Sequence, residues 1–242
     1  MKTKTAFKYE ITEKTRGGIP VIIVAAGSST RMNGINKQLA EISGVPVIIR
    51  TLLSFENSEE ISNIILVVRA DDVFTLQLLT EKYGISKLTD IVCGGDTRQE
   101  SVLKGLSRVA SDDQGVLIHD GARPLVSKAI IKNVVLGLEN YSAVTCAVSV
   151  VDTVKRVDAS GKVLETLDRS NLVAVQTPQG VNIADYRAAI EKVGDVSRFT
   201  DDTSIMEAAG FEVLTVEGER SNIKITTKSD IAFAEGLLEG KE

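Results

Sequence analysis

The chain has few of the residues on which several common chemistries and locations depend. It holds one histidine and two cysteines in 242 residues, and no apolar run reaches the roughly 18 residues of a membrane span. We find no Ser-His-Asp or Cys-His arrangement that would indicate covalent catalysis. Cys93 and Cys146 each lie within an apolar run. We therefore interpret both as buried thiols of a reducing compartment and expect no disulfide.

Positive charge is also limited, with 28 Lys and Arg against 33 Asp and Glu and a net charge of -5. This balance argues against a nucleic-acid partner, so any cationic site must be local. The first 18 residues are polar, end in Gly-Gly and lack the apolar core of a secretory signal. We expect a loosely held tail over 1–18 and a cytoplasmic protein without a membrane partner.

From Pro20 onward, short apolar runs alternate with amphipathic stretches of helical length. With 43% hydrophobic residues the chain can bury a full core, and residues 19–242 are predicted to form one α/β domain. Continuous apolar strands indicate a mostly parallel sheet with helices on both faces. The predicted strands are 21–26, 64–68, 91–93, 116–119, 143–151 and 213–216, and the predicted helices are 47–55, 73–83, 98–110, 129–138, 183–193, 203–209 and 231–238.

Residues 152–169 break this alternation. They contain two β-rich runs joined by the turn sequence DASG, with little core character. We expect a hairpin that projects as a β-arm and packs against a second copy in a homodimer. The alternative is a solvated edge hairpin.

The loop after the first strand has features of a phosphate site, because parallel sheets bind ligands at the carboxyl ends of their strands. Ala25, Ala26 and Gly27 let a ligand approach the main chain, and Ser28 and Ser29 supply hydroxyl and amide donors.

Two cations follow in the same loop. Arg31 and Lys37 beside a nest of backbone donors favour the binding of several phosphate charges. Residues 34–36 are Gly-Ile-Asn, so the loop is not a Walker A motif, and it lacks G-x-G-x-x-G. Both a P-loop NTPase and an ordinary dinucleotide enzyme are disfavoured.

The loop at residues 94–101, GGDTRQES, combines two glycines with a predicted helix start. Asp96 and Gln99 have the spacing of a capping box. Glycines before a cap also allow a planar base to lie against the backbone, where Asp96 and Ser101 can hydrogen-bond its edge.

Polar side chains also follow the later strands. His119 is predicted to be a structural hydrogen-bonding residue, and Asp120 lies where it can meet a metal or a ribose hydroxyl. Thr177-Pro178 is typical of a turn and Thr200 of a helix N-cap. Lys224, between two isoleucines, is expected at a strand end that faces a cleft.

Taken together, these segments resemble the 2-C-methyl-D-erythritol 4-phosphate cytidylyltransferase family. The resemblance rests on AAGSSTRM, NKQ, GGDTRQES, HDGARP, DTVKR, LDRSNL, QTPQG, FTDDTS and NIKITT in this order, and covers nearly all of the chain from Pro20. It implies a Rossmann-like nucleotidyltransferase domain, a dimerising β-arm, Mg2+, and transfer of CMP from CTP to the sugar-alcohol phosphate with loss of pyrophosphate.

The resemblance also implies roles for individual residues. Arg31 and Lys37 would stabilise the transition state, and Arg169 and Lys224 would position the sugar phosphate. Asp120, Thr177 and Thr200 would contact the sugar phosphate. The expected nucleotide contacts are Ala25, Ala26, Gly27, Ser28, Ser29, Gly95, Asp96, Ser101 and Gly121. Many members have glycine where this chain has Ser29 and alanine where it has Gly121, so both positions stay small.

Two alternatives stay open on the sequence. One is a cytidylyltransferase acting on ribitol 5-phosphate or another polyol phosphate, although DTVKR favours the erythritol enzyme. The other is a non-catalytic nucleotide-binding protein, which would have no reason to keep a second phosphate site at Arg169 and Lys224.

Overall fold

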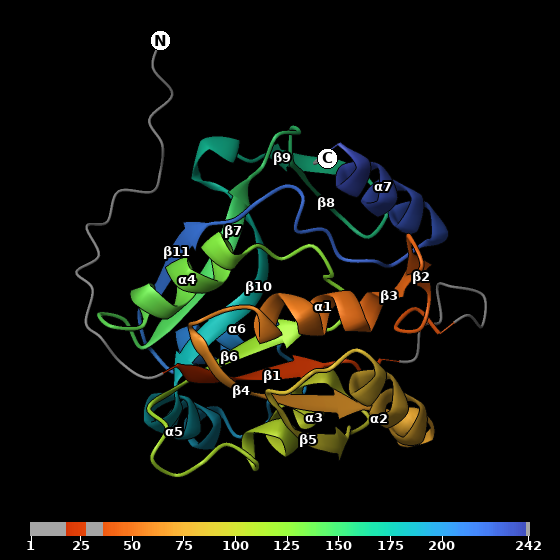
Figure 1. Ribbon diagram of the computed structural model, residues 1–242. Coiled ribbons are helices and arrows are strands. Elements are labelled where there is room, and N and C mark those ends of the chain that lie inside the picture. The colour runs from red at the N-terminus through yellow and green to blue at the C-terminus, as the bar shows by residue number, and fades with distance from the viewer. Residues whose placement is uncertain (1–17, 28–35, 241–242) are drawn as a thin grey trace.

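The apolar runs form a seven-stranded sheet at the centre of the molecule (Figure 1). This computed structural model describes residues 18–27 and 36–240. Along the sheet the strands are β11 (Val213–Glu217), β7 (Ala143–Ser149), β10 (Val173–Asn182), β6 (Gly115–Asp120), β1 (Ile19–Val24), β4 (Ile61–Val68) and β5 (Leu88–Cys93). Only β10 runs antiparallel to its neighbours, so the predicted, mostly parallel α/β sheet is confirmed.

Helices cover both faces of the sheet, as the sequence predicts. One face carries α1 (Val47–Glu56), α2 (Val73–Lys82) and α4 (Lys128–Gly137). The other carries α3 (Arg98–Leu106), α5 (Ile183–Val193) and α6 (Asp202–Ala208). The last helix, α7 (Lys228–Glu239), lies beside the small β2–β3 pair (Glu41–Ile42 and Val45–Pro46), as Figure 1 shows. In the described part of the chain, no helix has the length and apolar content to cross a membrane.

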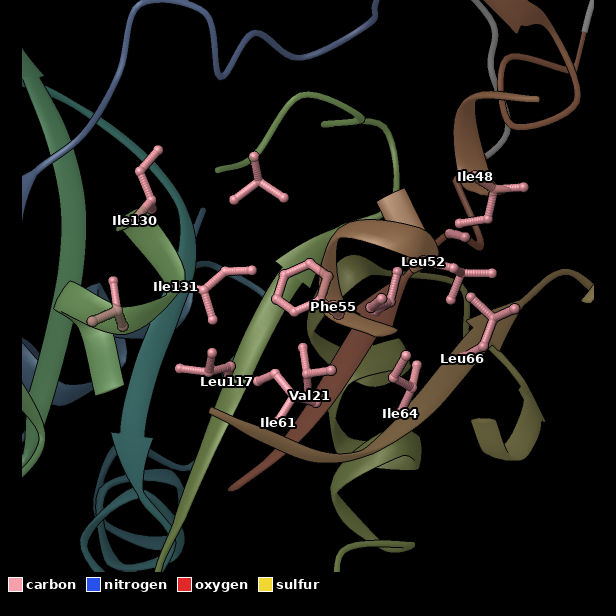
Figure 2. Close-up of a cluster of buried hydrophobic side chains, with 14 of the residues drawn as sticks. Val21, Ile48, Leu52, Phe55, Ile61, Ile64, Leu66, Leu117, Ile130 and Ile131 are labelled. Carbon is pink, nitrogen blue, oxygen red and sulfur yellow. The ribbon is translucent and has the colours of Figure 1, made fainter. Parts of the chain in front are cut away.

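The core explains why the central strands lack an alternating pattern. Val21 and Ile23 of β1 pack against α1 and α4, whereas Ile22 packs against α3 on the other face. Figure 2 shows the first of these clusters, with Phe55 of α1 above the sheet. A strand buried on both faces must be apolar throughout.

One element of the sheet was not predicted. Strand β10 includes the sequence QTPQG, which is typical of a turn, and the Thr177-Pro178 peptide, predicted to be a turn, lies in cis within the strand. The register of β10 against β7 is interrupted between Val175 and Gln179, which accommodates the proline. Tertiary pairing with β6 and β7 therefore overrides the local signal.

The predicted arm is present as a hairpin separate from the main sheet. Strands β8 (Lys155–Val157) and β9 (Val163–Thr166) pair only with each other, and every residue in them is exposed. The short helix η3 (Arg169–Asn171) then leads into β10, and a second 3-10 turn, η2 (Ala70–Asp72), precedes α2.

Candidate active site

Two cavities adjoin at the carboxyl edge of β1 and β6. One, of about 420 Å3, is lined by the first loop, the loop before α3 and the end of β6. The other, of about 540 Å3, is lined by β10, β11 and the residues before α6. Arg98, Asp120 and Lys224 line both cavities and form their common wall.

A third cavity lies at the opposite, amino edge of the sheet. It measures about 330 Å3 and is lined by Ile19, Gly115 and Asn182 among others. It holds none of the residues that the sequence predicts for the site.

The first loop contributes small residues and a lysine to the first cavity. Ala25 is buried and bonded through its N–H to the carbonyl of Val67 (2.7 Å), while Ala26, Gly27 and Lys37 line the cavity. Ser28, Ser29 and Arg31, which the sequence also assigns to this loop, lie outside the described residues.

Asn36 fixes the chain beside Lys37. Its side-chain oxygen accepts the N–H of Gln38 (3.1 Å), and its amide donates to Asp72 (2.9 Å). Asp72 is held by Arg69 through a 2.7 Å ion pair. The backbone next to Lys37 is thus tied to the end of β4.

The loop before α3 packs tightly against the first loop. A Cβ on Gly94 would lie 2.4 Å from Cβ of Ala26, so no side chain fits there. The Ser101 hydroxyl accepts the N–H of Gly95 (3.1 Å) and donates to the carbonyl of Thr97 (2.9 Å). Gly95, Asp96 and Ser101 all line the first cavity, where they were predicted to bind the nucleotide.

The start of α3 corrects the predicted capping box by one residue. Thr97, not Asp96, is the N-cap, and Glu100 completes the box in place of Gln99. The side chain of Asp96 is therefore not needed as the cap and lies exposed at the cavity.

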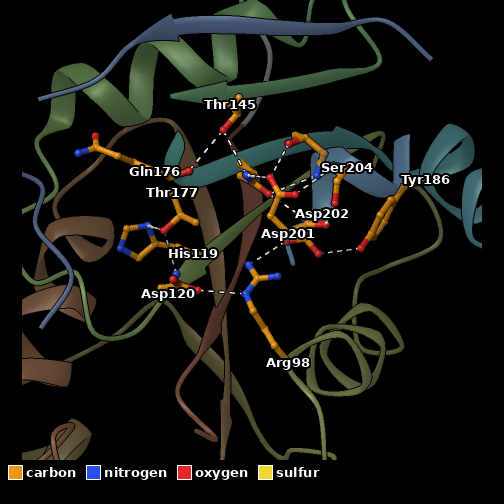
Figure 3. A network of polar contacts seen from close by, with 12 residues as sticks. Arg98, His119, Asp120, Thr145, Gln176, Thr177, Tyr186, Asp201, Asp202 and Ser204 are labelled. Atoms are coloured by element: carbon orange, nitrogen blue, oxygen red, sulfur yellow. Dashed lines mark hydrogen bonds and ion pairs between the residues drawn. The ribbon is translucent and has the colours of Figure 1, made fainter. Parts of the chain in front are cut away.

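Asp120, at the end of β6, is the anionic centre of the common wall (Figure 3). Its carboxylate pairs with Nε of Arg98 (3.2 Å) and with Nζ of Lys224 (2.6 Å). Burial alone would raise the pKa of Asp120, but Arg98 and Lys224 outweigh it and hold that pKa well below its usual range. Asp120 is a fixed carboxylate at neutral pH.

Two neighbouring side chains anchor the backbone of Asp120. Its N–H donates to the Thr177 hydroxyl (3.0 Å), which lies 3.1 Å from Nδ1 of His119. Nε2 of His119 lies 3.3 Å from the carbonyl of Arg123, which can only accept, so Nε2 carries the proton and Nδ1 accepts from Thr177. His119 is therefore a structural hydrogen-bonding residue, as predicted, and Thr177 lines the second cavity with its hydroxyl proton already donated.

Burial sets the protonation state of this histidine. His119 is fully buried with its ring edge-on to Phe55 at 4.8 Å, and burial lowers its pKa to about 3. It is neutral at physiological pH and is no general base there.

Lys224 reaches the common wall from a loop, which corrects the prediction of a strand end. The backbone N–H of Ile225 donates to the carbonyl of Ala122 (2.8 Å), and the Asn222 amide donates to the carbonyl of Thr177 (2.9 Å). Arg123 closes the arrangement by donating to the carbonyl of Asn222 (2.7 Å). The loop is thereby fixed against β6 and β10.

Of the remaining predicted residues Thr200, Gly121 and Arg169, only Thr200 lines one of the two cavities. Thr200 lines the second cavity, but the N-cap of α6 is Asp201, so the predicted cap was one residue early. Gly121 follows Asp120, and a Cβ there would come within 2.9 Å of Ile48. Arg169 is exposed in η3, donates to the carbonyl of Val151, and lines neither cavity.

Arg98 was not predicted to belong to the site, although it lies within the GGDTRQES segment. Its position in the sequence was a usable signal, because an arginine at the first helical position of α3 faces the strand ends. What could not be read from the sequence is its pairing with Asp120 and Asp202, which lie 22 and 104 positions further along the chain.

A doubly covered, mostly parallel sheet with cationic loops at its carboxyl edge is the architecture of a nucleotide-binding α/β enzyme. Comparison with known sequences narrows this class. The sequence model of the family described as IspD, 2-C-methyl-D-erythritol 4-phosphate cytidylyltransferase, matches residues 19–240. The chain belongs to this family.

Individual relatives of the chain carry the same enzyme name as the family. The chain is 42% identical over 224 residues to the 2-C-methyl-D-erythritol 4-phosphate cytidylyltransferase of Clostridium novyi (strain NT), covering 90% of this chain and 95% of the relative. A similar relative from Halalkalibacterium halodurans is also 42% identical, over 92% of this chain and 97% of its own length. The crystal structure of the 4-diphosphocytidyl-2C-methyl-D-erythritol synthase of Anaerococcus prevotii DSM 20548 superposes with a TM-score of 0.83 at 35% identity, covering 92% of this chain and 96% of that one.

Proposed function

We propose that this protein is a cytidylyltransferase that transfers CMP from CTP to 2-C-methyl-D-erythritol 4-phosphate, releasing pyrophosphate. Beside the family membership, one observation carries this proposal. Two cavities, one bordered by the small-residue first loop and one by polar strand ends, share a wall that contains both a lysine and an arginine. A wall of this kind suits two phosphate-bearing substrates that must meet.

The reaction brings two anions together, so the main task of the site is electrostatic. An oxygen of the sugar phosphate forms a bond to the α-phosphorus of CTP. The bond from that phosphorus to the oxygen bridging to the β-phosphate breaks, and pyrophosphate leaves with the electron pair. A phosphate monoester has its second pKa near ~6 and is largely dianionic at neutral pH, so no general base is required.

The described residues that support this mechanism are lysines of the first cavity. Lys37 lines it from the first loop, and Lys224 lines it as part of the common wall. Lys37 is assigned to the triphosphate and Lys224 to the incoming phosphate, where each offsets charge that builds up in the transition state. Arg31 is assigned to the triphosphate from its place in the first loop, and Arg169 to the sugar phosphate from its motif.

Mg2+ is proposed as the cofactor, arriving with the phosphates of CTP, because protein-bound Mg2+ is held largely by substrate phosphates and water. Both oxygens of Asp120 already face cations, which does not fit a direct metal ligand. Within residues 18–27 and 36–240, no three His, Cys, Asp or Glu side chains gather as a metal site. We therefore assign Asp120 to substrate contact rather than to the metal.

We also propose a homodimer formed through the arm, and a cytoplasmic location. Val157, Val163 and Leu164 of the arm are 50%, 52% and 58% exposed, which favours a partner surface. Both cysteines of the chain are free thiols, and this suits a reducing compartment. Cys146 is buried as predicted, whereas Cys93 is exposed, which corrects the prediction for that residue.

The function is tested by pyrophosphate release from CTP, with 2-C-methyl-D-erythritol 4-phosphate and ribitol 5-phosphate in parallel. Turnover with the erythritol phosphate and little with the ribitol phosphate is expected. Preference for ribitol 5-phosphate would replace the substrate assignment. Binding of CTP without pyrophosphate release from either mixture would refute an enzymatic function.

A further inference from the structure

Arg98 lies between two carboxylates at the common wall (Figure 3). Its Nε contacts Oδ1 of Asp120 at 3.2 Å, and its Nη2 contacts Oδ2 of Asp202 at 2.8 Å. Arg98 and Asp120 line both cavities, whereas Asp202 lines neither. Asp202 therefore has no direct contact with either cavity, and Arg98 links it to both.

Asp202 is fixed from every side. It is 0% exposed, its Oδ1 accepts the Tyr186 hydroxyl (2.8 Å), and its backbone N–H donates to Oε1 of Gln179 (2.9 Å). Tyr186 is itself 1% exposed. A fully buried carboxylate is costly unless it is paired, and Arg98 is the cation that pairs with it.

Lys224 is held much more loosely than Arg98. The Lys224 side chain is 37% exposed against 21% for Arg98. Within the described residues Arg98 forms ion pairs with two carboxylates, whereas Lys224 forms one with Asp120. A lysine on a flexible stem can turn from a carboxylate to a phosphate, whereas a planar guanidinium clamped by two carboxylates cannot.

We propose that Asp202 is a positioning residue for the dianionic phosphate substrate. It holds Arg98 in place, and Arg98 holds Asp120 in place when Lys224 turns from Asp120 to the phosphate of the sugar. This inference rests on the proposed function and adds a residue that lines neither cavity. Tyr186 supports the same chain of contacts from behind.

The test is Asp202→Asn, which keeps the shape of the side chain and can still accept from Tyr186. The matched control is Asp185→Asn, at the position before Tyr186 on α5. The Asp185 carboxylate accepts a hydrogen bond from the Ser142 hydroxyl (2.5 Å), and Asp185 lines neither cavity. For Asp202→Asn, the Michaelis constant for the sugar phosphate is expected to rise about tenfold or more, with that for CTP within about threefold. The control should change neither constant.

A double substitution separates positioning from a general structural effect. With Asp120→Asn already in place, Asp202→Asn should add less than about twofold to the Michaelis constant for the sugar phosphate, because its effect passes through Asp120. An equal rise of both Michaelis constants, an unchanged Michaelis constant in the single variant, or an additive double variant would overturn the proposal.

Folding and function are separated by two further measurements. If Asp202→Asn does not fold, Tyr186→Phe removes only the hydroxyl behind Asp202, and a smaller shift of about two- to fivefold in the same constant is expected. No shift in a folded Tyr186→Phe protein would then count against the proposal. The parent enzyme is assayed first, since absent turnover there refutes the proposed function, whereas an active parent with unaltered variants refutes only the role of Asp202.

Discussion

At the scale of single residues, the site depends on where charge is held. Asp120 is buried and paired twice, His119 is buried and neutral, and the lysines lie at the cavity surface. Lys224, whose side chain is 37% exposed, therefore faces a buried carboxylate that is held in place. This is the arrangement expected of a site that must accept and release phosphates.

Replacing Lys224 with Met should lower kcat/KM by about 10²-fold or more, because transition-state charge loses its partner. Lys37→Ala should have an effect of the same order. The control is Lys228→Met, an exposed position at the start of α7, which should retain the parent rate. Steady-state pyrophosphate release measures all three. Parent-level turnover by Lys37→Ala would remove that lysine from the mechanism.

His119 should make the protein less stable in weak acid. The folded-state pKa of about 3 lies below the ordinary value of about 6.5, so the unfolded chain binds the extra proton between these values. The stability due to His119 is complete above pH 6.5 and declines as the pH falls. Between pH 6.5 and 5.0 the free energy of unfolding should drop by about 2 kcal/mol from this residue.

This effect can be isolated because the chain has one histidine. Urea unfolding of the parent and of His119→Asn at pH 6.5 and 5.0 gives the comparison. The variant is expected to be less stable overall, since it loses the contact with Phe55, yet to lose about 2 kcal/mol less between the two pH values. Parallel pH dependence in both proteins would contradict the assignment.

Gly94→Ala should damage the nucleotide cavity. The new methyl group would meet Cβ of Ala26 at 2.4 Å and Oγ of Ser101 at 2.8 Å, so the two loops must separate, at a cost of about 1–3 kcal/mol in stability. We expect a higher Michaelis constant for CTP. The control is Gly236→Ala in α7, where nothing lies within 4 Å and the helix should gain about 0.5–1 kcal/mol.

At the scale of elements, the arm carries three exposed apolar side chains close together in sequence, Val157, Val163 and Leu164. Leu164→Lys should weaken assembly by placing a charge on an apolar face, so that light scattering moves from twice 26.0 kDa toward 26.0 kDa. Phe74→Lys is the matched control, because Phe74 of α2 is 72% exposed but lies outside the arm. A dimer that survives Leu164→Lys, or a parent that is already monomeric, would contradict the proposed interface.

The elements also show where sequence patterns succeed and fail. Strands buried on both faces, such as β1, are recognisable because packing demands apolar residues throughout. In β10, the side chains of Gln176, Thr177 and Gln179 are buried but hydrogen-bonded to residues outside the strand, so polar residues occupy core positions without a local signal. Only the partners from distant segments make them compatible with a strand.

At the scale of the whole molecule, topology brings the site together. The motifs were predicted to form one site because strand ends of a parallel sheet share an edge, and Lys37, Asp120, Thr177, Thr200 and Lys224 do line the two cavities. The ion pairs among them were beyond prediction, since Asp120 and Lys224 lie 104 positions apart. The predicted helix caps were wrong by one residue because Asp and Thr are adjacent at both helix starts and either side chain can cap a helix.

The wall shared by the two cavities has a consequence for inhibitor design. Any compound that draws Lys224 away from Asp120 alters the lining of both compartments at once. A fragment bound in one cavity should thus change the affinity of a fragment bound in the other. A single molecule that tethers a cytidine mimic to an anionic polyol mimic would have to be optimised as one ligand.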